Sequence, residues 1–182
     1  MPTMKIGSLV FYKNIKGFTS WIQRVVLGTD ISHVSIYIGK DEMGNMMEFE
    51  ANPYWVDRTT LKIKPPEQME IYEINLPEKD IKDTLNFLIE ELEETKYSYV
   101  QWLTTFIRQC FEWLGFDAKS WKILWGWGST CSEVVYHHLY NLPFDDLGNM
   151  LAELLKYNPN TFHNRDIKDI IKKFPELFTR IQ

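Results

Sequence analysis

The sequence predicts an α+β fold, in which a small antiparallel sheet or partial barrel packs against helices. Two observations lead to this class. Short segments of alternating apolar and polar residues dominate the first third of the chain, and segments with helical periodicity dominate the remainder. No low-complexity stretch interrupts the 182 residues, so we expect one domain over residues 1–182 with a mostly helical C-terminal half.

The composition excludes several classes of protein. With 45% hydrophobic, 15% aromatic and 25% charged residues, the chain is typical of a folded globular protein. A net charge of −5 and the lack of a basic stripe argue against a nucleic-acid partner. No apolar run has the length of a signal-peptide core or a transmembrane segment, which predicts a cytoplasmic location. Action outside the cell or on a host wall stays open, as does the oligomeric state.

The first third of the chain is expected to form strands and one helix. Residues 32–52 predict an antiparallel hairpin, because "SHVSIYIG" and "MMEFEA" both alternate and the polar connector "GKDEMGN" joins them. The other expected elements are strands at residues 7–13, about 54–63 and 69–76, and a helix at 18–28.

The remainder is expected to be helical. "PEKDIKDTLNFLIEELEET" has the stripe of an amphipathic helix, and a very aromatic helix is predicted from about 98 to 114. In the aromatic helix, Cys110 shares a stripe with apolar residues, and we expect it to be a buried thiol in a helix-packing gap. That stripe consists of Val100, Leu103, Ile107, Cys110 and Leu114. Further helices are expected at about 130–141, 146–156 and 165–173.

Cys131 is the first candidate for a functional residue. In "TCSE", Thr130 and Glu133 have the spacing of a capping box, which places Cys131 at the first position of a helix. The positive end of the helix dipole favours a thiolate there, and the free backbone N–H groups suit an oxyanion. From this motif alone Cys131 is a buried small side chain, a metal ligand or a nucleophile.

A nucleophilic thiol needs a base, and the chain has four histidines. His138 is seven helical residues from Cys131, about 10 Å along the axis, and His137 points away, so both are expected on the helix surface or its packing edge. His163 lies in a loop-like segment without an obvious orienting partner. His33 begins a strand whose opposite face supplies the core, which leaves its own face free to line a cleft.

The hairpin supplies a carboxylate for His33. If the turn centres near residues 41 to 42, the numbers of paired residues add up to about 83 or 84, and Glu50 lies beside His33. Glu48 is then nearer Ile36 and is the second choice. A turn shifted by one residue changes the direct pairing but still leaves Glu50 the closer carboxylate.

A metal site is the competing interpretation of the same residues. His33, Glu50 and Cys131 are all potential zinc ligands, and Glu133 with His137 forms a weak i, i+4 pair. No HExxH, CxxC or closely spaced histidine motif accompanies them. We therefore expect no metal and no other cofactor.

Four short motifs together resemble the NlpC/P60 superfamily of papain-like cysteine peptidases and amidases, in its circularly permuted YiiX/YaeF-like branch. They are "KIGSLVFYK", "ISHVSIYIG", "MEFEA" and "TCSEVVYHHL". Their order is specific, because unpermuted members place the cysteine before the histidine and here it follows. The segment "NPNTFHNRDIKDI" is also similar to the one after the cysteine helix in permuted members.

This resemblance implies a papain-like fold and a catalytic triad, with Cys131 as nucleophile, His33 as general base and acid, and Glu50 as the third member. The backbone N–H of Cys131 would contribute to the oxyanion hole. Ser35 stands where many relatives have glycine, which is expected to narrow the cleft.

The implied function is hydrolysis of an amide bond through a thioester, as a cysteine peptidase (thiol protease) or amidase. Expected substrates are a peptide, a peptidoglycan fragment with γ-D-glutamyl linkages, or an acyl amide. The alternatives are an acyltransferase or lipid deacylase, as in lecithin:retinol acyltransferase-like proteins, and a catalytically silent binding module. An aromatic-walled substrate pocket is a further expectation, formed by Tyr54, Trp55, Trp125 and Trp127; Trp121 lies in the same loop as the last two.

Overall fold

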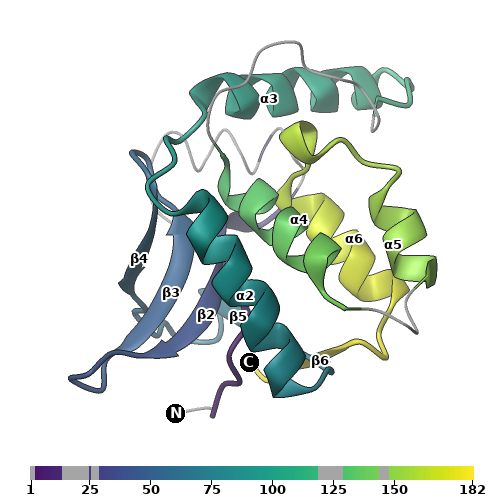
Figure 1. The fold of residues 1–182 in the computed structure, drawn as a ribbon. Coiled ribbons are helices and arrows are strands. Elements are labelled where there is room, and N and C mark those ends of the chain that lie inside the picture. The colour runs from purple at the N-terminus through teal and green to yellow at the C-terminus, as the bar shows by residue number, and fades with distance from the viewer. Residues whose placement is uncertain (1–2, 14–24, 26–28, 119–128, 144–147) are drawn as a thin grey trace.

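The computed structural model describes residues 3–13, 25, 29–118, 129–143 and 148–182. Within them the chain forms a six-stranded antiparallel sheet with helices packed on it, as the sequence predicts (Figure 1). The strand order is β4-β3-β2-β1-β5-β6. The strands are β1 (Leu9–Lys13), β2 (Ile31–Lys40), β3 (Met46–Ala51), β4 (Val56–Thr60), β5 (Met69–Ile74) and β6 (Phe178–Arg180). The helices are α2 (Glu78–Leu92), α3 (Tyr99–Trp113), α4 (Cys131–Asn141), α5 (Gly148–Leu154), the 3-10 helix η1 (Pro159–Thr161) and α6 (Asn164–Lys173).

The alternating strands give the sheet two apolar faces. Leu9, Phe11, Val34 and Ile36 project toward the helices and join the main core. The other face carries a smaller cluster around Val10. Because successive side chains alternate, the polar residues between the core residues of β2 and β3 do not point into the main core as Val34 and Ile36 do.

Helices α2, α4 and α6 cover the main core side of the sheet (Figure 1). Helix α4 contacts both β2 and β3. The apolar stripe predicted for α2 is buried, through Ile81, Leu85, Leu88 and Ile89. None of the helices in the described residues is both long and apolar enough to cross a bilayer.

Helix α3 differs from its prediction. It lies at the top of Figure 1, apart from the sheet, and packs on η1. The stripe that includes Cys110 faces outward instead of filling a packing gap: Leu103 is 51% exposed and Leu114 is 72% exposed, and Cys110 is half-buried. The expectation of a buried Cys110 was therefore wrong, because the polar side of this helix is the buried one.

One further element departs from the sequence prediction, and one stays untested. Strand β6 pairs with β5, although the C-terminal residues gave no strand pattern. The helix expected at 18–28 falls outside the described residues, apart from Val25.

The hairpin is confirmed as β2 and β3, but its register differs from the prediction. Ile36 pairs with Phe49 and Tyr37 with Glu48, so the numbers of paired residues add up to 85 and not to 83 or 84. The turn, centred near residue 43, causes this shift: the pairs next to it, Gly39 with Met47 and Lys40 with Met46, add up to 86, and a bulge beside Gly39 brings the sum back to 85.

Candidate active site

Cys131 is the first residue of α4, and the predicted capping box is confirmed. The backbone N–H of Glu133 donates to the Thr130 hydroxyl at 3.4 Å, and the backbone N–H of Thr130 donates to the Glu133 carboxylate at 3.3 Å. The Ser132 hydroxyl donates to the carbonyl of Phe162 at 2.6 Å, which anchors the first turn. Cys131 is therefore held at the positive end of a fixed helix, with only 8% of its surface exposed.

His33 and Glu50 are brought together by the twisted hairpin. Nε2 of His33 lies 2.5 Å from Oε2 of Glu50, and the Thr59 hydroxyl donates to Oε1 of the same carboxylate at 2.7 Å. In the observed register Glu50 is a diagonal neighbour of His33 and not its direct partner. The reasoning that Glu50 stays the closer carboxylate after a shift of the turn is consistent with this contact.

The electrostatics connect His33 to Cys131. Burial by itself lowers the pKa of His33, but hydrogen bonds to Cys131 and to Glu50, with the negative charges of both, raise that pKa well above its ordinary value. Burial raises the pKa of Glu50, yet the hydrogen bond from His33 and the positive charge of its ring bring the net shift below the ordinary value. Because Glu50 occupies Nε2, the nitrogen left for the thiol is Nδ1.

A second carboxylate lies on the same face of the sheet and has different partners. Oε2 of Glu48 accepts hydrogen bonds from the Tyr12 hydroxyl at 2.5 Å and from the Ser35 hydroxyl. Burial raises the pKa of Glu48 despite these two bonds. The Tyr12 ring is stacked on His33, with ring centroids 5.7 Å apart.

Sequence reasoning missed the role of Tyr12. Its position in β1, directly opposite His33 in the β1–β2 pairing, is the signal that could have revealed it. Ser35, which was expected to narrow the cleft, is instead 1% exposed. Its hydroxyl donates to Glu48, which was the second choice for the third member.

A cleft of about 1030 Å³ borders the His33–Glu50 pair. The residues that line it are mostly of polar types and include Thr59, Lys62 and Lys64, and Cys131 is not among the described residues that line it. Lys62 and Lys64 are exposed on the segment that follows β4. The cleft therefore lies on the side of the histidine and the carboxylates and presents ammonium groups along one edge.

The remaining histidines have other surroundings and partners. His138 is fully buried, with its ring near Gly7, and was not expected so deep in the core; burial lowers its pKa to about 4. His137 is partly exposed, 3.8 Å from Glu133. His163 has the orienting partner that the sequence did not reveal, because its Nδ1 caps α6 by accepting from the backbone N–H of Asp166.

The structure describes only two of the four residues predicted to form an aromatic pocket. Tyr54 and Trp55 lie exposed in the connection from β3 to β4 and do not line the cleft, and Tyr99 donates its hydroxyl to the carbonyl of Pro53 next to them. Trp125 and Trp127 fall outside the described residues. A role for these four side chains in substrate binding stays a prediction.

Comparison with known proteins identifies a solved structure with the same fold as this chain. No family model matches the chain, and no curated protein does. Among solved structures, the crystal structure of metalloprotein yiiX from Escherichia coli O157:H7 matches with a TM-score of 0.59 and 16% sequence identity, over 98% of this chain and 97% of that one. The chain therefore has the fold of this yiiX structure over nearly its whole length.

Proposed function

We propose that this chain is a cysteine hydrolase of the permuted NlpC/P60 type, which cleaves amide bonds through a thioester on Cys131. The observation that carries the proposal is the position of His33. Nε2 of its ring lies 2.5 Å from the Glu50 carboxylate, and interactions with Cys131, the first residue of a capped helix, contribute to its raised pKa. The near full-length likeness to the yiiX structure and the order of the sequence motifs support the same assignment.

The proposed reaction has two steps. In the first, His33 takes the proton of the Cys131 thiol, and the thiolate attacks the carbonyl carbon of the amide. The N–H groups at the start of α4 face the developing oxyanion, and the amine leaves with the proton from His33. In the second, His33 takes a proton from water, the hydroxide attacks the thioester, and the acid departs as the thiol is restored. Glu50 keeps the imidazole oriented and stabilises its charged form throughout.

The chemistry of the cleft favours a peptide-like substrate over a lipid. Lysine, glutamate, threonine and glutamine side chains dominate the lining beside His33. An acyl chain would gain little there, because burying apolar surface against charged groups leaves them desolvated. An amide with carboxylate groups nearby, as in cell-wall peptides, suits the exposed Lys62 and Lys64. The acyltransferase and lipid deacylase alternatives have no such support in the described residues.

A metal-dependent reaction is not part of the proposal. The related yiiX structure is described as a metalloprotein. In the described part of this chain, no group of three or more His, Cys, Asp or Glu side chains is arranged to hold a metal ion. The donor set of His33, Glu50 and Cys131 is also engaged internally, because Nε2 of His33 is bonded to Glu50.

Selective alkylation tests the proposal. The protein is treated with iodoacetamide near pH 6, and modified cysteines are mapped by mass spectrometry in the wild type and in His33→Ala. We expect Cys131 to react faster than the half-buried Cys110 in the wild type, although it is the less exposed thiol. The His33→Ala substitution should remove that advantage and leave Cys110 unchanged.

The substrate class is tested separately. Wild type and Cys131→Ser are incubated with peptidoglycan fragments, with γ-glutamyl peptides and with short acyl esters, and products are identified by mass spectrometry. Amide cleavage that depends on Cys131 is the expected result. If Cys131 alkylates no faster than Cys110 and none of the substrates is consumed, the catalytic proposal fails and a binding module takes its place.

A further inference from the structure

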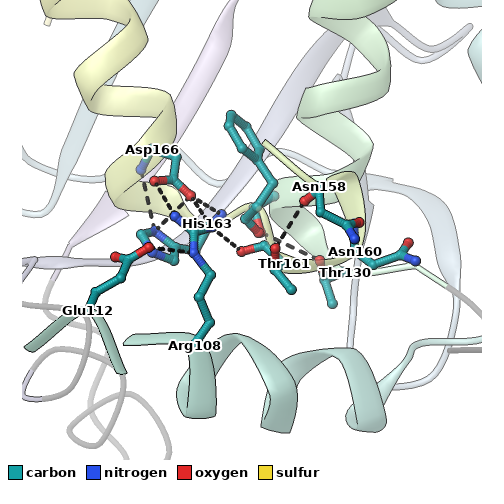
Figure 2. Close-up of polar contacts among 10 residues, drawn as sticks. Arg108, Glu112, Thr130, Asn158, Asn160, Thr161, His163 and Asp166 are labelled. Carbon is teal, nitrogen blue, oxygen red and sulfur yellow. Dashed lines mark hydrogen bonds and ion pairs between the residues drawn. The ribbon is translucent and has the colours of Figure 1, made fainter. Parts of the chain in front are cut away.

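Helix α3 is attached to the protein through its polar side. Arg108 is 1% exposed, and its guanidinium donates two hydrogen bonds to the Asp166 carboxylate at 2.9 and 3.2 Å and one to the carbonyl of Thr161 at 2.7 Å (Figure 2). It also donates to Glu112, one turn further along α3, at 2.7 Å. A surface helix normally exposes its charged groups to water, but here Arg108 and Glu112 form ion pairs within the protein.

The opposite side of α3 is apolar and exposed. We define the outer face as Val100, Leu103, Ile107, Cys110 and Trp113 of α3, together with Leu114, which directly follows the helix. The five large apolar members are each between 42% and 72% exposed, and Cys110 is half-buried. From their exposed fractions we estimate roughly 550 Å² of apolar surface, at the upper end of what the largest patch of a typical monomer exposes.

The spacing along the outer face is that of a helix–helix seam. Val100, Leu103, Ile107, Cys110 and Leu114 follow one another at intervals of three, four, three and four residues. Apolar residues at these intervals pack against a second helix as the a and d positions of a coiled coil do. A free pair of helices this short is marginal in water, but here each α3 is already fixed to its own domain by the Arg108 pairs.

We propose that α3 is the contact between two copies of this chain, which pair outer face to outer face around a two-fold axis. The same patch serves both copies, as an isologous interface requires. Its area supports this occupant, since a standard interface buries about 800 Å² per partner, of which roughly 60% is apolar. Each chain has a net charge of −5, but Arg108 and Glu112 lie on the buried side of α3. The two copies therefore bring no like charges together at the two-fold axis. The proposal is independent of the proposed function.

Sedimentation velocity over a concentration series tests the pairing. We expect wild type to form a dimer, and Leu103→Glu to weaken it by roughly a hundredfold, because the substitution enters the interface twice. Met43→Glu is the matched control, since Met43 is an 85% exposed apolar residue far from α3, in the turn between β2 and β3. Circular dichroism verifies that the variants fold.

Crosslinking locates the axis without introducing a charge. Ile107 is the middle of the seam, so it faces its own copy whether the helices run parallel or antiparallel. In a Cys110→Ser background, Ile107→Cys should form a disulfide-linked dimer on mild oxidation, and Met43→Cys should not. A wild type that stays monomeric throughout, or a dimer that Leu103→Glu leaves intact, overturns the proposal. Monomers that float with phosphatidylcholine vesicles would overturn it too and assign the outer face to a lipid surface.

Discussion

Replacing Glu50 with glutamine removes one negative charge from the site and keeps the shape of the side chain. In the wild type, Oε2 of Glu50 is 2.5 Å from Nε2 of His33, and the two side chains are 16% and 19% exposed. A hydrogen bond between charged groups contributes about 1.5–3 kcal/mol. Since one pKa unit corresponds to about 1.4 kcal/mol, the substitution should lower the pKa of His33 by roughly one to two units. Partial exposure of the pair favours the smaller value.

NMR titration of the His33 ring measures this shift. The titration is performed in a Cys131→Ser background, so that the thiol does not titrate together with the imidazole. Glu48→Gln is the matched control, because Glu48 lies on the same face but bonds Tyr12 and Ser35 instead of His33. Its effect on the pKa of His33 should be clearly smaller. Equal shifts in the two variants, or a shift below about half a unit in Glu50→Gln, would refute the assignment of Glu50 as the orienting group.

Three further predictions concern stability, each measured by urea denaturation. Thr130→Ala removes the cap of α4 and should cost about 1 kcal/mol of unfolding free energy, whereas Thr130→Ser should keep most of it; equal losses would contradict the cap. Arg108→Met leaves Asp166 buried without its partner and should cost about 3–5 kcal/mol, and adding Asp166→Asn should recover part of that loss; a fully additive double variant would contradict the pairing. Burial lowers the pKa of His138 to about 4, so the unfolded state binds a proton at higher pH than the folded state does. The free energy of unfolding should therefore fall by about 1.4 kcal/mol per pH unit as the pH drops from about 6.5 to 4. His138→Leu should flatten that slope, and an unchanged slope would assign the loss to other groups.

Local patterns were sufficient where one short segment carries the whole signal. The capping box of "TCSE" needs only four consecutive residues, and the structure has both of its hydrogen bonds. The strand alternation of β2 and β3 placed His33 and Glu50 on one face, because side chains in a strand alternate with a period of two. The exact register was wrong because the turn is centred near residue 43 instead of 41 to 42, and alternation alone does not locate the centre of a polar turn.

Long-range contacts explain the predictions that failed. Strand β6 forms only because β5 offers it an edge, and His163 gains Asp166 only once α6 begins there. Helix α3 shows the limit most clearly. Its periodicity identified an apolar stripe and a polar stripe, but periodicity does not say which stripe faces the protein. Asp166 and the carbonyl of Thr161, more than fifty residues away in sequence, bind Arg108 and turn the polar stripe inward.

The sequence by itself determined the α+β class, the strand and helix types in the described residues other than β6 and η1, and a capped helix that starts at Cys131. Each of these depends on neighbours within a few residues, where backbone geometry imposes the spacing. Only the tertiary structure decided that Glu50 bonds His33 diagonally, that Tyr12 and Glu48 form a second pair beside it, and that the apolar side of α3 faces outward. These depend on strand twist and on charges that meet across the fold, and both arise only when distant segments are packed together.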